Sequence, residues 1–356
     1  MLTACAVARG AILSGQYVPN RDAQRNVQRN AQRCVTFLEL PDRRRAATHQ
    51  LMRYGKAAVA VLSRGLRHPD PMIVCQCVHM LKMIGPDAAA ARPALLKLAA
   101  SKDPVLSRAG RWGLAGIRDL GIVLVNQPDE KTVREFDSKG NLLRAIIIEE
   151  RSYDADRLPN GNYLACLLTK GQVVELDAKN KIVWSFDGCS HPLDADRLPS
   201  GNTLIAGGKT KRVLEVDPQG KVVWEWKGTN WPNDADRLPC GNTLVTDSPA
   251  KMIYEVDPSG KVVWSHRPTN GGVIDVERLP TGNTVFVRSH GKGAVEIDPM
   301  GVIVREFTDG YPRAIARHPD GTTVVGGNAG LVFYDAKGKM LWEKKGLGQI
   351  NAVHRY

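Results

Sequence analysis

The residues of this chain best suited to chemistry are aspartates that recur at a fixed distance. The motif Asp-Ala-Asp-Arg begins at Asp154, Asp194 and Asp234, 40 residues apart each time, and a variant begins at Asp275. Carboxylate oxygens that converge on one point suit Ca²⁺, so these four aspartates form a candidate metal ring. The alternative is structural: each aspartate pairs with an arginine or a backbone N–H and ties neighbouring units together. We expect the structural role, because buried charges are usually paired.

The rest of the repeat indicates which elements position these aspartates. Each copy continues with a Leu-Pro-x-Gly-Asn turn or a variant of it, an apolar run, a second turn and an outer apolar segment. A period near 40 residues, carried by alternating apolar residues and Gly/Pro turns, is typical of a β-propeller blade. The aspartate motif then lies on the innermost strand and borders the central channel. Recurring tryptophans would fill the gap between adjacent sheets; they are Trp184, Trp224, Trp264 and Trp342.

The two ends of the repeat region complement each other. The first repeat, which starts near residue 120, lacks its innermost strand, and residues 351–356 resemble that strand. Pairing of these two segments would close the ring and remove its open edges. The sequence therefore predicts an all-β six-bladed β-propeller over residues 119–356, closed by the C-terminal strand.

A small all-α domain is expected before the propeller, over residues 21–118. Its amphipathic segments are punctuated by Asp-Pro steps at 70–71 and 103–104, where Asp would cap a helix and Pro would take the first helical position. Helix pairs at this spacing resemble HEAT repeats, which form α-solenoids. Residues 1–20 are expected to be poorly ordered.

The positive charge of the chain is concentrated in its N-terminal third. Residues 1–118 contain 19 Lys and Arg against 6 Asp and Glu, whereas residues 119–356 contain 30 against 31. Such an excess suggests an acidic partner, such as nucleic acid, anionic lipid or an acidic protein. The alternative is a solvated surface rich in arginine. Four arginines follow one face of the first predicted helix: Arg21, Arg25, Arg29 and Arg33.

The loops of the predicted propeller supply candidate ligand-binding residues. Aromatic and cationic side chains together at a channel mouth would suit an anionic aromatic ligand or a peptide. The candidates are Tyr153, Trp231, Tyr311, Lys209 and Lys211. No apolar run approaches the length that a membrane-spanning helix needs.

Two segments resemble repeats of known bacterial propeller families. Residues 213–226, VLEVDPQGKVVWEW, are similar to the PQQ-like propeller repeat, and residues 233–244, NDADRLPCGNTL, are similar to the arylsulfotransferase-type propeller. The resemblance implies the propeller fold for the C-terminal two thirds of the chain. Quinoprotein dehydrogenases have a larger ring and dedicated cofactor ligands, so six blades without adjacent cysteines argue against PQQ as a cofactor.

The arylsulfotransferase resemblance also implies an activity, but the motif departs from that family. Its histidine nucleophile would precede the motif aspartate, where this chain has Tyr153, Leu193, Asn233 or Ile274. The nearest substitute is His191. An enzyme of this kind would transfer sulfate between phenolic compounds at the channel mouth, with His191, Arg288 and His290 as its candidate catalytic residues.

We therefore predict a non-catalytic ligand-binding or protein-binding scaffold with a basic helical module; the arylsulfotransferase-like enzyme is the alternative. Its expected partners are a protein or a small anionic or aromatic ligand at the propeller face, and an acidic partner on the helices. The similar propellers function outside the cytoplasm, so the resemblance implies an extracytoplasmic location for this protein. Residues 2–5, Leu-Thr-Ala-Cys, look like a lipoprotein cleavage box, which would apply if the true start lies upstream; otherwise we expect a cytoplasmic protein.

Overall fold

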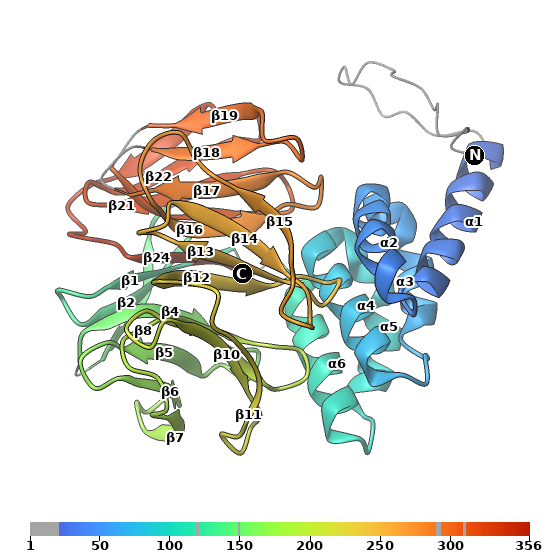
Figure 1. Cartoon of the computed structure of the whole chain (residues 1–356), viewed down its shortest axis with the longest axis horizontal. Coiled ribbons are helices and arrows are strands. Elements are labelled where there is room, and N and C mark those ends of the chain that lie inside the picture. The colour runs from blue at the N-terminus through green and yellow to red at the C-terminus, as the bar shows by residue number, and fades with distance from the viewer. Residues whose placement is uncertain (1–20, 119–120, 149, 290–292, 309–310) are drawn as a thin grey trace.

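The computed structural model describes residues 21–118, 121–148, 150–289, 293–308 and 311–356. A helical region packs against one end of a six-bladed β-propeller (Figure 1). Both parts of the predicted fold class are therefore confirmed. The prediction for residues 1–20 lies outside the described residues. In the part of the chain that the structure describes, no helix is long and apolar enough to cross a membrane.

The helical region, called the helical module below, forms because apolar residues recur on one side of each helix. Its α-helices surround a shared core that contains Leu51, Leu62, Ile73 and Leu95, all fully buried. The Asp70 carboxylate caps its helix by accepting a hydrogen bond of 2.8 Å from the backbone N–H of Met72, as the Asp-Pro pattern predicts. The elements are α1 (Arg21–Phe37), α2 (Pro41–Tyr54), α3 (Val59–Gly65), α4 (Pro71–Ile84), α5 (Arg92–Ala99) and α6 (Pro104–Gly116), with short 3₁₀ segments at Gly55–Ala58 and Gly85–Ala91.

The propeller consists of six four-stranded antiparallel sheets, and each blade runs from an inner to an outer strand. Blade one is β24 (Ala352–Arg355), β1 (Ile122–Gln127), β2 (Thr132–Asp137) and β3 (Leu142–Ile147). Blade two is β4 (Ser152–Arg157), β5 (Tyr163–Leu167), β6 (Gln172–Leu176) and β7 (Ile182–Phe186). Blade three is β8 (Pro192–Arg197), β9 (Thr203–Gly207), β10 (Arg212–Val216) and β11 (Val222–Trp226).

The other three blades repeat this order. Blade four is β12 (Pro232–Arg237), β13 (Thr243–Asp247), β14 (Met252–Val256) and β15 (Val262–His266). Blade five is β16 (Val273–Arg278), β17 (Thr284–Arg288), β18 (Ala294–Ile297) and β19 (Ile303–Phe307). Blade six is β20 (Pro312–Arg317), β21 (Thr323–Gly327), β22 (Gly330–Tyr334) and β23 (Met340–Lys344).

The C-terminal strand closes the ring as predicted. β24 pairs antiparallel with β1, and Val353 lies opposite Val125. Beyond the strand, the backbones of Ile122 and Tyr356 exchange two hydrogen bonds of 3.2 and 3.0 Å. Chain segments more than 200 residues apart therefore share one blade, so no inner edge is left unpaired there.

The motif arginines join neighbouring blades, but not through the motif aspartates. Arg197 forms an ion pair of 3.0 Å with Glu175, which lies on the third strand of the preceding blade. The expected Asp–Arg pairs are therefore wrong: a motif aspartate is a neighbour in sequence, but the glutamate faces the guanidinium across the blade interface. The same pairing recurs as Arg157–Glu135, Arg237–Glu215, Arg278–Glu255 and Arg317–Glu296.

The tryptophans lie between sheets, as expected. The Trp184 indole N–H donates a hydrogen bond of 3.0 Å to the carbonyl of Pro218 in the next blade, and the Arg197 guanidinium lies 4.9 Å from the centre of the Trp184 ring. Trp224 repeats both contacts, with the Pro258 carbonyl and with Arg237. Each indole therefore adds a hydrogen bond and a cation–π contact to the blade interface.

The helical module docks on the propeller face where the inner strands end. The Trp112 indole donates a hydrogen bond of 3.0 Å to the Arg197 carbonyl, and Arg108 Nε donates one of 3.0 Å to the Ser200 carbonyl. Arg45 of α2 binds the carboxylate of Glu255 through two bonds of 2.6 and 2.9 Å. Figure 1 shows α4 and α6 beside the propeller and α1 on the far side. One mouth of the central channel is thus covered by the chain's own helices.

Candidate ligand site in the propeller channel

The inner strands surround a central channel, and the first aspartates of the motifs form its upper ring, away from the helices. These carboxylates accept hydrogen bonds from the backbone N–H groups of the next blade: Asp194 from Ala235 at 3.0 Å, Asp234 from Val276 at 2.6 Å, and Asp275 from Ile315 at 2.8 Å. The expected bonds from aspartate to backbone are therefore confirmed. The fourth member, Asp154, lies 2.9 Å from His354 Nε2 on the closing strand.

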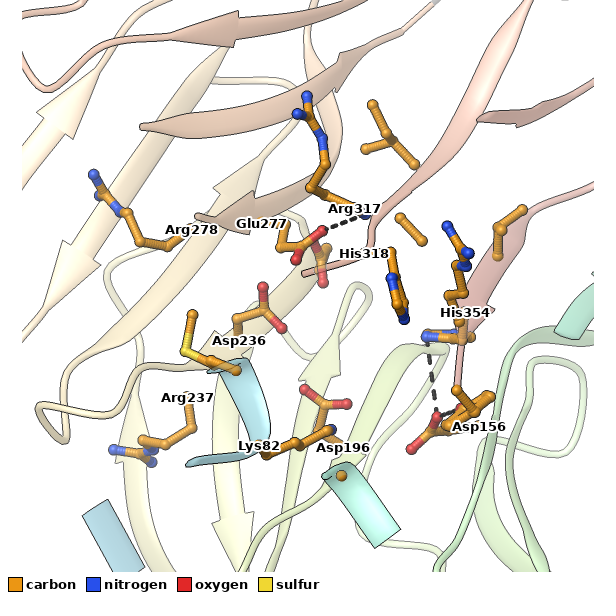
Figure 2. Close-up of a pocket in the computed structure, with 18 of the residues that line it drawn as sticks. Lys82, Asp156, Asp196, Asp236, Arg237, Glu277, Arg278, Arg317, His318 and His354 are labelled. Carbon is orange, nitrogen blue, oxygen red and sulfur yellow. Dashed lines mark hydrogen bonds and ion pairs between the residues drawn. The ribbon is translucent and has the colours of Figure 1, made fainter. Parts of the chain in front are cut away.

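A second set of carboxylates, the lower ring, lies two residues further along the same strands. Because side chains alternate along a strand, residues two apart point to the same side. The lower ring therefore faces the channel below the upper one. Figure 2 shows its members around the cavity, together with Lys82, His318 and His354. The members of the lower ring are Asp156, Asp196, Asp236 and Glu277.

Both rings line one cavity of about 490 Å³. Its upper end is bordered by Tyr153 and Asn233, and its lower end by Lys82 of α4 and Trp112 of α6. Tyr153 lies close to the side chains of Asn233 and Arg313, which belong to two other blades. The channel is therefore a chamber with acidic walls, bordered by polar side chains above and by the helical module below.

Enclosure changes the acidity of the carboxyl groups in both rings. Burial, followed by the nearby charge of Asp156, raises the pKa of Asp196 to about 6, although Lys82 and His354 act in the opposite direction. Burial likewise raises the pKa of Asp275 to about 7 and that of Glu277 to about 7. The pKa values rise because water no longer stabilises each ionised carboxyl group fully and because the neighbouring carboxylates repel its negative charge. Burial and neighbouring carboxylates also hold the pKa values of three further groups well above their usual range: Asp194, Asp234 and Asp236.

His354 is the positive counterpart of these carboxylates. Burial alone would lower the pKa of this imidazole, but the charge and hydrogen bond of Asp154, followed by the charges of Asp156 and Asp196, raise it to about 10. His354 is therefore an imidazolium at neutral pH. It occupies, in blade one, the position that Asp156 has in blade two.

The chamber does not have the geometry of a calcium site. Among the described residues, no three His, Cys, Asp or Glu side chains come close enough together to hold a metal ion. Three of the four upper-ring aspartates are instead engaged by backbone N–H groups of the next blade. Ca²⁺ requires six to eight oxygens around one point, whereas these oxygens are spread over two rings.

Two of the predicted catalytic residues, His191 and Arg288, do not line this chamber. The imidazole of His191 lies 6.3 Å from the Trp231 ring, in an edge contact on blades three and four, and its Nδ1 lies 3.4 Å from the Ser190 hydroxyl. Arg288 of blade five pairs with Glu306 at 3.3 Å. His290 lies outside the described residues.

The predicted ligand-binding residues divide into two groups. Tyr153 borders the chamber. Trp231 contacts Gly208 next to Lys209, because a β-carbon on that glycine would lie within 2.9 Å of the indole. Tyr311 is 66% exposed and, like Lys211, has a positive φ angle, so it lies in a loop rather than in the chamber wall.

Sequence reasoning missed the lower ring of the chamber and also His354, Lys82 and His318. The second acidic position of each repeat was a visible signal for the lower ring, and the alignment of residues 351–356 with the motif placed His354 at that position. Lys82 and His318 had no such signal. Lys82 belongs to a helix outside the repeat, and His318 replaces the leucine of the first turn in blade six.

No family model matches the sequence, and no curated protein matches it. The structure is similar to a protein of unknown function from Bacteroides caccae, with a TM-score of 0.56, 16% identity, and coverage of 65% of this chain and 97% of that one. It is also similar to a streptogramin B lyase, with a TM-score of 0.52, 14% identity, and coverage of 66% and 83%. At these identities the likeness shows the fold alone, so the class of protein defined here is a six-bladed propeller with an acidic axial chamber.

Proposed function

We propose that the protein is a non-catalytic binding protein whose ligand site is the axial chamber. The observation that carries this proposal is the pair Asp196 and Asp236. Both line the cavity, and neither carboxylate hydrogen-bonds with protein atoms in the described ranges. Carboxylate oxygens accept hydrogen bonds, so two carboxylates that face one cavity and share no hydrogen bond with the protein favour a ligand that donates them.

The positions of the other candidates favour binding over sulfate transfer. A nucleophilic histidine needs a second His or Arg near the same reacting point. His191 lies beside Trp231, whereas Arg288 pairs with Glu306 two blades away. A chromogenic aryl sulfate with a phenol acceptor tests this alternative. Transfer by the wild type that His191→Ala abolishes would establish the enzyme and overturn the non-catalytic proposal.

The helical module supports a second proposal, that it binds an acidic partner on the side away from the propeller. Arg45 and Arg108 already contact the propeller, but Arg29, Arg33 and Arg53 are exposed. Charge complementarity at such a surface is screened by salt. We expect retention of the full chain on heparin to fall steeply with salt and to weaken in Arg29→Ala/Arg33→Ala; equal elution of variant and wild type would argue against this surface.

A compound library tests the chamber itself, with thermal stability of the full-length protein as the measurement. Ala316 takes, in blade six, the position of the lower-ring acids. Ala316→Phe should fill the cavity and abolish stabilisation by compounds that bind there. Ala178→Phe, at an exposed turn, is the matched control. Compounds that stabilise all three proteins equally would place the binding site elsewhere.

A further inference from the structure

The acidic side chains of the two rings outnumber the cationic groups that face them. The two rings contribute eight acidic side chains to the lining of the chamber, and the nearby motif arginines are already paired with glutamates between blades. Lys82 and His354 face the carboxylates, and their charges act on several of them. A cationic ligand would therefore find an attractive potential in the chamber, strengthened by its low-dielectric walls.

Asn233 adds an observation that does not depend on the carboxylates. Its side chain is only 7% exposed and borders the upper part of the cavity. Within the described ranges, its amide oxygen has no hydrogen-bond partner. A buried acceptor without a donor is costly unless a ligand supplies one. Since an amide oxygen can only accept, the missing ligand group is a hydrogen-bond donor, as an ammonium is.

Lys82 shows which kind of cation the lower ring accommodates. This lysine reaches the cavity from α4, and its ammonium lies 4.3 Å from the centre of the Trp112 ring. Its charge acts on Asp156, Asp196, Asp236 and Glu277. Figure 2 shows Lys82 beside Asp196. The protein itself thus presents a primary ammonium to the lower ring.

The spacing of the acceptors favours an extended cation over a compact one. Residues two apart on a strand are separated by about 6.6 Å along it, so the two rings are stacked at that interval. In the described part of the chain, no three acidic or histidine side chains converge on a metal-sized point. A ligand with several ammonium groups on short aliphatic spacers would instead contact Asn233, the upper ring and the lower ring together.

We propose that the chamber binds a linear aliphatic polyamine along the propeller axis. This rests on the proposed function and names its ligand class. One ammonium would lie near Asn233 and Asp234, and another between Asp196 and Asp236. Lys82 would compete with the second ammonium for the lower ring.

The test is isothermal titration of the full-length protein with spermidine, near neutral pH and at low salt. Asp196→Asn and Asp236→Asn keep the shape of the side chain and break no hydrogen bond with the described residues, so we expect folded variants that bind spermidine at least about tenfold more weakly. Asp187→Asn makes the same chemical change at an exposed residue and should bind like the wild type. Lys82→Met, which removes the competing ammonium, should bind about tenfold more tightly.

Three outcomes would overturn the proposal. They are no heat of binding with spermidine, equal affinity in Asp187→Asn and Asp196→Asn, and saturable binding of CaCl₂ without binding of spermidine. Triethylene glycol, a linear neutral probe, should give no signal. If spermidine fails while a library compound loses its stabilisation in Ala316→Phe, the chamber is still a binding site and only the polyamine class is wrong. If no compound distinguishes Ala316→Phe from the wild type either, the proposed function fails as well.

Discussion

Arg45 of the helical module and Glu255 of blade four form a two-bonded ion pair, with distances of 2.6 and 2.9 Å. The Glu255 side chain has no exposed surface, and it also binds Arg278 and Asn242. The same glutamate therefore joins two blades and holds the helices over the channel.

The first prediction concerns this ion pair. Arg45→Ala removes one of the two arginines but leaves Glu255 with Arg278, so we expect a loss of about 1–2 kcal/mol in the free energy of unfolding. Urea unfolding followed by tryptophan fluorescence measures it. Arg53→Ala, at an exposed residue at the end of the same helix, should change the free energy by less than about 0.5 kcal/mol. Equal effects of the two substitutions would contradict the docking role of Arg45.

The second prediction concerns the imidazolium of His354. Its folded-state pKa of about 10 lies above the ordinary value of 6.5, so protonation stabilises the folded state. This contribution is complete below about pH 6.5 and is lost as the pH rises toward 10. His354→Gln should therefore lower stability by about 2 kcal/mol near pH 6, and the difference should shrink toward pH 10. Thermal unfolding across this range measures it, and a difference that does not vary with pH would show that Asp154 does not hold the proton there.

The third prediction concerns Asp196, whose ionisation destabilises the folded state, whereas that of His354 stabilises it. The pKa of Asp196 is raised from 3.8 to about 6, so ionisation opposes folding, and its cost grows between these two values and is complete above them. Without ligand, Asp196→Asn should stabilise the protein by about 1 kcal/mol near pH 8 and leave it unchanged near pH 4. Melting curves at both pH values test this, with Asp187→Asn as the neutral control. A stabilisation that is equal at both pH values would have a cause other than charge.

The fourth prediction concerns the closing strand. Deletion of residues 351–356 exposes the inner edge of β1 and removes the packing of the buried Val353. We expect a loss of at least about 3 kcal/mol in stability and self-association through the open edge. Thermal unfolding and light scattering measure both effects. Val353→Ser keeps the strand and should lose stability without associating; a monomeric deletion variant with wild-type stability would contradict the closure.

The repeat made the propeller predictable because each copy encodes its own turns and strand alternation. The positive φ angles of Gly161, Gly201 and Gly241 fit the turns that their Leu-Pro-x-Gly-Asn motifs predict. The pairing of Arg197 with Glu175 was not predictable in this way, since the two residues belong to different copies and meet only when blades pack. The position of Lys82 at the channel could not be predicted from the sequence for a similar reason. Its place under the channel depends on contacts such as that between Trp112 and Arg197, which no local pattern encodes.

The candidate site was only half visible in the sequence. The aspartate motif correctly placed a band of carboxylates at the channel, because an inner strand of a blade always borders the axis. The loop candidates were chosen by residue type alone, and residue type does not say which loops approach each other. For this reason His191 and Arg288 were predicted to belong to one catalytic site, although they lie on different blades.

The acidic residues of the chamber all belong to blades two to five. At the corresponding positions, blades six and one have Ala314, Ala316, Ala352 and His354. The charge distribution around the chamber is therefore asymmetric: the acidic wall of blades two to five faces the neutral or positive wall of blades six and one. A bound cation would rest against the wall of blades two to five, off the axis, and the opposite side would leave room for an uncharged substituent. The side that lacks acids is also the side where the two ends of the propeller sequence meet.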